Sequence, residues 1–181
     1  EGKMTKKEAE TEEKKGNNNT AELPGKFRRI IASPMTIDIY EIDAVKALLD
    51  ADQVVIAAGG GGIPVLQQGS HLKGASAIIE KDYTAAKMAE LVDASTLLFL
   101  TGYDKLTIEK GTANEKAFDK VSASELHKYI KDGHFPAVTT FPKVDASIRF
   151  VTADPERKAV ISNLDKALMS LEGKSGTTIT A

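Results

Sequence analysis

The sequence predicts an α/β fold in three layers: an open, mainly parallel sheet with helices on both faces. The first observation is a set of uninterrupted apolar runs, "VVIAA", "TLLFL" and "AVIS", which are typical of strands covered on both faces. The second is that segments with apolar residues at helical spacing lie between these runs. Alternation of the two patterns indicates helices packed onto a parallel or mixed sheet.

The first 26 residues are polar and charged, and we expect them to form a separate subdomain. Residues 8–15 favour a short surface helix, and "KKGNNNT" at residues 14–20 has the composition of a flexible loop. The character changes at Phe27, where "RRIIAS" predicts a short strand that ends before Pro34. Residues 27–181 are therefore the expected main domain.

The middle of the chain alternates between predicted helices and strands. A helix is expected over residues 41–51, and "QVVIAA" predicts a buried strand over residues 54–58. A short strand follows at residues 76–80, and then a helix over residues 81–93. The apolar stripe expected on this helix consists of Ala85, Met88, Ala89 and Val92. The run "STLLFLTG" predicts a further buried strand that ends at Gly102.

The last third continues the alternation. Residues 107–121 predict a hairpin or insertion, and a helix capped by Ser122 or Ser124 then ends at Gly133. The segment "PKVDASIRFVTA" predicts a helix that turns Val144, Ile148 and Val151 inward. The strand "KAVISN", the helix "LDKALMSLEG" closed by Gly173, and the strand "GTTITA" complete the prediction.

Composition excludes several classes of protein. Lys and Arg number 24 and Asp and Glu number 26, so the formal charge is −2 and offers no basic excess for nucleic acid. The absence of cysteine excludes disulfides, thiolate nucleophiles and cysteine-based zinc sites, and His71, His127 and His134 have no paired metal spacing. No apolar run approaches the roughly 18 residues of a membrane span, and residues 1–15 do not resemble a secretory signal. We expect a cytoplasmic enzyme or binding domain.

Four successive glycines, Gly59, Gly60, Gly61 and Gly62, follow the predicted strand 54–58. Ligands of open α/β sheets bind at the carboxyl ends of strands, and free backbone N–H groups there can hold a phosphate or another small anion. The alternative is a tight strand-to-loop turn, although a turn requires fewer glycines. The loop is not a Walker A motif, because no Gly-Lys-Ser/Thr follows.

Charged residues at other element ends are further candidates. Lys81, between Glu80 and Asp82, could bridge the oxygens of a phosphoryl group in transfer. The alternative is that Asp82 only caps the following helix while Lys81 is solvated. Thr101 and Asp104, in "LTGYD", could meet a nucleotide. Lys143, after a proline at a helix start, is a candidate phosphate ligand or an ordinary surface lysine.

Four stretches, in order, carry a family resemblance. "RRIIASPMTIDIYE" is similar to RR-V-V-x-S-P-x-P-I-D-I-x-E, and "AAGGGGIPV" to CGGGGIPV. "LTGYD" is similar to L-T-x-V-D, and "GHFPAVTTFPK" to G-H-F-A-P-G-S-M-x-P-K. With the segments between them they cover nearly the whole chain, which resembles carbamate kinases, of the amino-acid-kinase fold. "MTKKEAE" is also similar to the stretch that precedes the family's protruding lid subdomain, so residues 1–26 are expected to be a remnant of that lid.

The resemblance implies reversible phosphoryl transfer between carbamoyl phosphate and ADP, giving ATP at the end of arginine deiminase catabolism. It implies a homodimer and Mg²⁺ carried by the nucleotide. The glycine loop 59–62 would hold carbamate, Lys81 would stabilise the moving phosphoryl group with Asp82 orienting it, and Lys143 would hold nucleotide phosphates. The nucleotide site would be lined by Glu80, Thr101, Gly102, Asp104, Lys143, Ile161, Ser162 and Asn163.

The sequence also departs from the family pattern. The family's N-terminal half, with its motif A-L-G-G-N-A, has no counterpart here. Glu80 stands for an aspartate, Val138 for a glycine, and Thr139 and Thr140 for Ser-Met. These departures leave two alternatives: a non-catalytic, regulatory relative that binds nucleotide, and a kinase of the same fold with another acceptor, as in acetylglutamate or uridylate kinases.

Overall fold

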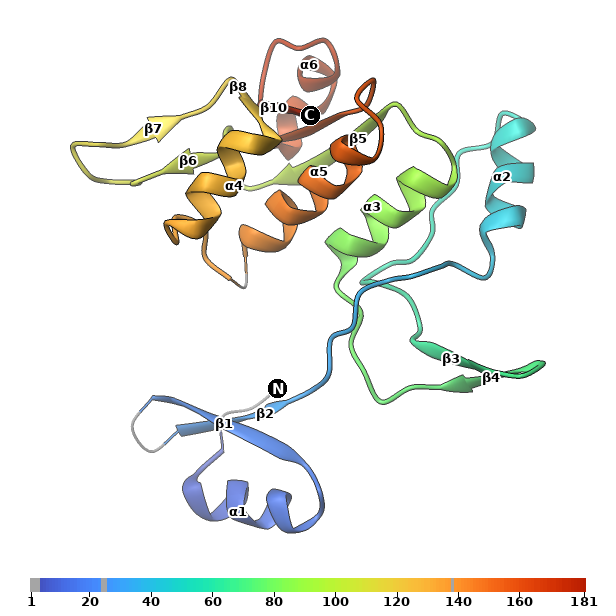
Figure 1. The fold of residues 1–181 in the computed structure, drawn as a ribbon, viewed down its shortest axis with the longest axis vertical. Helices are drawn as coiled ribbons and strands as arrows, with labels where there is room; N and C mark the ends of the chain where they lie inside the picture. Colours follow the sequence, from blue (N-terminus) through green and yellow to red (C-terminus); the bar gives the residue numbers. More distant parts are fainter. Residues whose placement is uncertain (1–3, 24–25, 138) are drawn as a thin grey trace. The chain divides into compact units, whose positions relative to one another are not determined.

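The chain divides into two compact units in the computed structural model, which describes residues 4–23, 26–137 and 139–181. The first unit joins the residues up to Pro34 to residues 63–79, and the second joins residues 35–62 to residues 80–181. Along the chain, the first border between the units follows Pro34, whereas composition predicts a boundary after residue 26. Figure 1 shows the elements of each unit along the chain.

The first unit consists of one helix and two antiparallel hairpins. Helix α1 (Lys6–Lys14) begins with a capping box, in which Thr5 and Glu8 bond to each other's backbone N–H groups. Strands β1 (Asn18–Leu23) and β2 (Lys26–Ile30) form the first hairpin, and β3 (Val65–Gln68) and β4 (His71–Gly74) form the second. The prediction of a flexible loop over residues 14–20 was wrong for Asn18–Thr20, because ladder pairing with β2 overrides their turn-like composition.

The second unit contains a four-stranded mixed sheet in the order β5-β9-β10-β8. Its strands are β5 (Thr96–Thr101), β9 (Lys158–Asn163), β10 (Thr177–Thr180) and β8 (Lys120–Ser122). Two of the three pairings, β5 with β9 and β10 with β8, are parallel, and β9 with β10 is antiparallel. The predicted open, mainly parallel sheet is confirmed.

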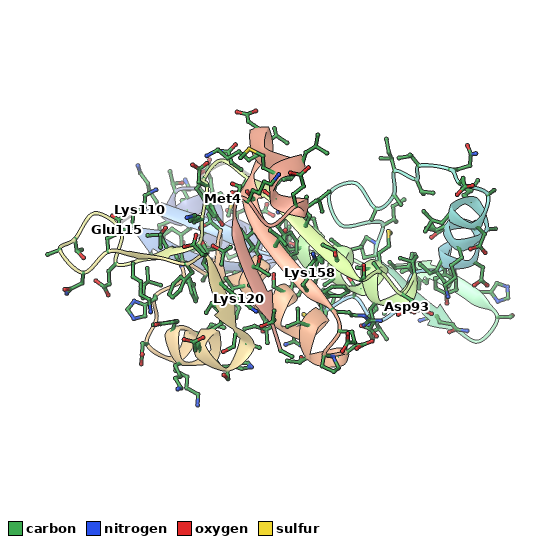
Figure 2. All side chains as sticks on the ribbon, turned by 90° about the horizontal axis from the view of Figure 1, so that it is seen from above. Met4, Asp93, Lys110, Glu115, Lys120 and Lys158 are labelled. Carbon is green, nitrogen blue, oxygen red and sulfur yellow. The ribbon has the colours of Figure 1, made fainter. Side chains whose placement is uncertain are left out.

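Helices cover both faces of this sheet. Figure 2 shows α4 (Ala123–Lys131) and α5 (Phe141–Ala153) on one side and α6 (Ala167–Leu171), which follows the 3-10 turn η1 (Leu164–Lys166), on the other. Val144, Ile148 and Val151 of α5 are buried, as predicted. Helix α3 (Lys81–Leu91) packs along α5 (Figure 1), and α2 (Ile42–Asp50) confirms the helix expected over residues 41–51.

A short hairpin extends from the sheet. Strands β6 (Thr107–Ile108) and β7 (Lys116–Ala117) pair antiparallel, and Figure 2 shows Lys110 and Glu115 near the end of this hairpin. The hairpin or insertion expected over residues 107–121 is thus confirmed as a hairpin for residues 107–117, whereas residues 120–121 belong to β8 of the main sheet. No helix in the described ranges is long and apolar enough to cross a membrane.

Two predicted strands were wrong. Residues 54–58 are irregular, and the side chains of Val54 and Ile56 are 95% and 97% exposed. A strand covered on both faces requires neighbouring strands, and none of the described residues pairs with this run. Residues 76–80 contribute only an isolated bridge between Ala77 and Ala32.

The apolar stripe predicted on α3 is only partly correct. Ala89 is buried, but Ala85, Met88 and Val92 are half-buried. The helix instead buries Asp82, Thr84 and Ala86. Asp82 and Thr84 face inward because Lys143 and the carbonyl oxygen of Gly61 satisfy their side chains.

Candidate functional site

A nearly buried ion pair joins the first turns of α3 and α5. Lys143 Nζ donates to Asp82 Oδ2 at 2.8 Å, and the two side chains are 16% and 6% exposed. Pro142 precedes Lys143 at the start of α5, where a missing N–H costs nothing. The ion pair thus holds two helix N-termini together, and the N–H groups and partial positive charge there favour anions.

Lys81 lies beside this pair but is bonded to its own neighbour. Its Nζ contacts Glu80 Oε1 at 2.9 Å, and its side chain is 56% exposed. The Glu80 hydrogen bond raises the pKa of Lys81, and the Asp82 carboxylate adds to the rise. The amine is therefore charged at neutral pH. The expectation that Asp82 orients Lys81 differs from these contacts, because Asp82 is hydrogen-bonded to Lys143 instead.

The glycine loop is tied to the first turn of α3 by one buried hydrogen bond. Thr84 Oγ1 donates to the carbonyl oxygen of Gly61 at 2.8 Å, and Thr36 Oγ1 lies 2.9 Å from the same hydroxyl. Gly61 and Gly62 have φ angles of 138° and 93°, a region that favours glycine. The loop turns at this point, next to α3, and its glycines allow the positive φ angles that the turn requires.

The carboxyl ends of β5 and β9 form the neighbouring edge of the sheet. Thr101 pairs with Asn163 in the ladder, and the Thr101 hydroxyl contacts the carbonyl oxygens of Ser162 at 3.0 Å and Tyr103 at 2.8 Å. It also accepts from the Tyr103 N–H at 3.2 Å. Thr101 therefore fixes the turn after β5 and sets the place of the Tyr103 side chain.

Asp104 and the residues after β9 form a second, more exposed group. Lys166 Nζ donates to Asp104 Oδ2 at 2.6 Å, and this hydrogen bond holds the pKa of Asp104 below its usual value. Asn163 Oδ1 accepts from the Asp165 N–H at 3.0 Å and so caps η1. Asp104 and Asn163 thus lie at one edge of the sheet, at the carboxyl ends of β5 and β9.

Two further residues of the expected nucleotide site are buried within β9. Ile161 is part of the apolar core, and Ser162 Oγ accepts a hydrogen bond from Ser170 Oγ at 2.6 Å. The Ser162 hydrogen bond holds α6 against β9, and neither side chain faces solvent. Gly102 lies exposed between Thr101 and Tyr103. Val138, which replaces a glycine of the family pattern, lies outside the described residues.

Apart from Gly102, Ile161 and Ser162, the expected site residues therefore fall into two groups. The first contains Glu80, Lys81, Asp82 and Lys143 with the glycine loop, and the second contains Thr101, Asp104 and Asn163. Within the described ranges, no group of three or more His, Cys, Asp or Glu side chains could hold a metal ion.

Comparison with known proteins gives the family. The sequence pattern of the amino acid kinase family matches residues 11–163, most of the chain. The chain belongs to the amino acid kinase family. A carbamate kinase-like protein YqeA of Escherichia coli strain K12 is 45% identical over 97% of this chain and 57% of its own length. The carbamate kinase of Clostridium perfringens is 41% identical over 97% of this chain and 56% of its own length.

A solved structure agrees with these relatives. The carbamate kinase of Giardia lamblia bound to AMP-PNP has a TM-score of 0.88 and 30% identity to this chain, covering 99% of this chain and 57% of that one. This amino acid kinase chain thus spans about half the length of the relatives that it matches. The resemblance to carbamate kinases noted from the sequence is confirmed.

Sequence reasoning missed three residues of this candidate site. Thr84 ties the glycine loop to α3, Tyr103 has a buried hydroxyl in the turn after β5, and Lys166 pairs with Asp104. A polar residue in the first turn of a helix and a tyrosine at the carboxyl end of a strand were the available signals. Neither signal predicts which residue is contacted, because the contacting residues are distant in the sequence.

Proposed function

We propose that this chain carries the nucleotide-binding part of a carbamate kinase, which transfers a phosphoryl group reversibly between carbamoyl phosphate and MgADP to form ATP. The observation that carries the proposal is the nearly buried Lys143–Asp82 pair between two helix N-termini. The motif resemblance and the similarity to carbamate kinases support it.

Each group would have one task in this reaction. Lys143 would hold the nucleotide phosphates, with Asp82 keeping its amine in place. Lys81 would move from Glu80 to the transferring phosphoryl group, whose charge it would stabilise. The glycine loop would hold the carbamate side, and the β5–β9 edge would hold the nucleotide. Such a reaction depends on positioning and electrostatics, and these are what the arrangement offers.

The wider setting is also proposed by resemblance. Turnover would require the part of a carbamate kinase that this chain does not span, because the family's second glycine motif has no counterpart in this sequence. The assembled enzyme would be a cytoplasmic homodimer that works in arginine catabolism.

The test is ATP formation from MgADP and carbamoyl phosphate, using the longest natural chain that contains these residues. We expect Lys81→Ala to lower kcat by roughly 100-fold or more, since it removes one electrostatic contact to the transition state. Lys87→Ala is the matched control, because Lys87 lies on the same helix and pairs with Glu90 at its far end. Equal turnover of the Lys81 variant and the control would refute the proposal.

A non-catalytic, nucleotide-binding role is the second candidate. The contact that favours it is the 2.9 Å bond between Lys81 and Glu80, which occupies the amine needed for transfer. MgADP binding without ATP formation in the assay above would support this role. Replacing carbamoyl phosphate with other acyl phosphates in the same assay distinguishes a kinase with another acceptor.

A further inference from the structure

The hydroxyl group of Thr84 holds one peptide group of the glycine loop. Its Oγ1 donates to the Gly61 carbonyl oxygen at 2.8 Å, and Thr84 is only 2% exposed. The other acceptor within reach, the Glu80 carbonyl oxygen, lies farther away at 3.4 Å. Since a hydroxyl carries one hydrogen, the shorter bond to Gly61 takes it. Gly61 is buried as well, so its carbonyl oxygen needs this donor.

A second threonine keeps the Thr84 hydroxyl in this direction. Thr36 Oγ1 lies 2.9 Å from Thr84 Oγ1, and because Thr84 gives its hydrogen to Gly61, Thr36 is the donor in this pair. The Thr84 N–H donates to the Glu80 carbonyl oxygen at 3.2 Å, within the turn of α3 that carries Lys81. The Gly61 carbonyl group is therefore held at a set place relative to the start of α3.

Holding the Gly61 carbonyl group also fixes the N–H group of Gly62, because both belong to one planar peptide group. This peptide is trans, so its N–H points opposite to its C=O. The carbonyl oxygen faces the Thr84 hydroxyl, and the Gly62 N–H therefore points away from that side chain. Gly62 is exposed, and a Cβ atom there would meet nothing within 4 Å. A ligand can thus approach the backbone of this residue closely.

The loop uses two of its four N–H groups in its own turns. Those of Gly59 and Gly61 donate to carbonyl oxygens two and three residues earlier, at 2.8 Å and 2.9 Å. The N–H groups of Gly60 and Gly62 have no acceptor among the residues that the structure describes. Of these two donors, Gly62 is the one whose peptide group is held by a buried side chain. The loop therefore offers one free N–H in a fixed direction.

We propose that Thr84 is a positioning residue for the acyl phosphate: by holding the Gly61 carbonyl group, it directs the Gly62 N–H toward an anionic oxygen of that ligand. The inference rests on the proposed function for its ligand, carbamoyl phosphate. Thr84 itself does not touch the ligand, and it acts through the peptide group between Gly61 and Gly62. A backbone N–H fixed in this way is a preorganised donor for a negatively charged oxygen.

The kinetic test measures ATP formation by Thr84→Val and Thr84→Ser in the longest natural chain. Valine keeps the shape of threonine but releases the Gly61 carbonyl group. We expect it to raise the KM for carbamoyl phosphate roughly tenfold, as loss of a hydrogen bond to a charged group requires, and to leave the KM for MgADP unchanged. Serine keeps the hydroxyl and should restore the KM for carbamoyl phosphate.

Thr177→Val is the matched control. Thr177 is also buried, and its hydroxyl donates to a backbone carbonyl oxygen, that of Phe118, from strand β10. We expect this variant to leave both KM values unchanged. An unchanged KM for carbamoyl phosphate in Thr84→Val would overturn the positioning role. Equal rises in both KM values would also overturn it, because they would mean a general loosening of the fold.

A second measurement separates the positioning role from the kinase proposal, and it needs only the unaltered protein, so it holds even where Thr84→Val does not fold. The NMR signal of the Gly62 amide is followed while carbamoyl phosphate is added without nucleotide. A saturable shift in a protein that forms no ATP supports the positioning role and contradicts the kinase proposal. ATP formation with an unmoved Gly62 signal overturns the positioning role alone. No shift and no ATP formation overturn both.

Discussion

Asp82 and Lys143 form the ion pair that joins the first turns of α3 and α5. Because the Asp82 side chain is 6% exposed, removing its charge leaves the Lys143 ammonium nearly buried without a counter-ion. We expect Asp82→Asn to lower the free energy of unfolding by roughly 3 kcal/mol, measured by urea denaturation. Asp104→Asn is the control, since it breaks an exposed pair with Lys166 and should have little effect. Equal stability of the two variants would contradict the burial argument.

Tyr83 gives a pH dependence with a definite sign. Burial, assisted by Asp145, raises the pKa of Tyr83 to about 12 from an ordinary value near 10. Between these values the folded state holds a proton that the unfolded state has lost, so the stability from this group is present below pH 10 and is lost as pH rises toward 12. Urea denaturation at pH 9 and pH 11 should show a smaller fall in stability for Tyr83→Phe than for the unaltered chain. An equal fall would show that Tyr83 does not contribute.

Among the turns that join elements, alanine substitutions at Gly176 and Gly111 distinguish the cost of crowding around a new Cβ atom from the cost of backbone strain. A Cβ atom there would lie 2.8 Å from Ser162 Cβ and 2.9 Å from the Ile161 carbonyl oxygen, whereas one on Gly111 would meet nothing within 4 Å. Both glycines have φ near +80°, so alanine strains the backbone equally at the two positions. We expect Gly176→Ala to cost about 2 kcal/mol more than Gly111→Ala in the free energy of unfolding. A smaller penalty at Gly176 would mean that β9 and β10 separate easily.

The elements that could be predicted are those whose own residues decide their structure. Strand β9 is apolar enough to be covered on both faces, and α5 carries Val144, Ile148 and Val151 at helical spacing. Residues 54–58 show the limit of this reasoning, because a β-branched run becomes a strand only when another strand pairs with it. The hairpin β3–β4 was missed because its side chains are exposed and mix apolar with polar residues, and only Gly69, at φ 62°, marked its turn.

For the site, the sequence allowed the charged residues to be predicted but not the contacts between them. The charged residues around Lys81 and the lysine at the start of α5 could be identified, because chemistry and position at an element end coincide there. Their pairing could not, since Asp82 and Lys143 are 61 residues apart and Asp82 has Lys81 next to it in the sequence. The unpaired hydroxyl of Tyr103 depends on packing among several elements, which no local pattern contains.

At the scale of the whole molecule, the second unit carries both groups of site residues. It also exposes large apolar side chains at Ile37, Val54 and Ile56, which are 86%, 95% and 97% exposed. Apolar residues exposed in such number mark surfaces that bind other protein segments. This exposure agrees with a chain that spans about half the length of its relatives, and with the proposal that turnover requires more than these residues.

Calorimetric titration of the chain with MgADP is the first measurement to make, because we propose that this unit holds nucleotide phosphates through Lys143. The variant is the double replacement Asp82→Asn with Lys143→Met, which removes both charges and so avoids leaving one buried alone. We predict that the unaltered chain binds MgADP and that the double variant, still folded by circular dichroism, binds it at least tenfold more weakly while adenosine binding is unchanged. Equal MgADP affinity of the two proteins would contradict the claim.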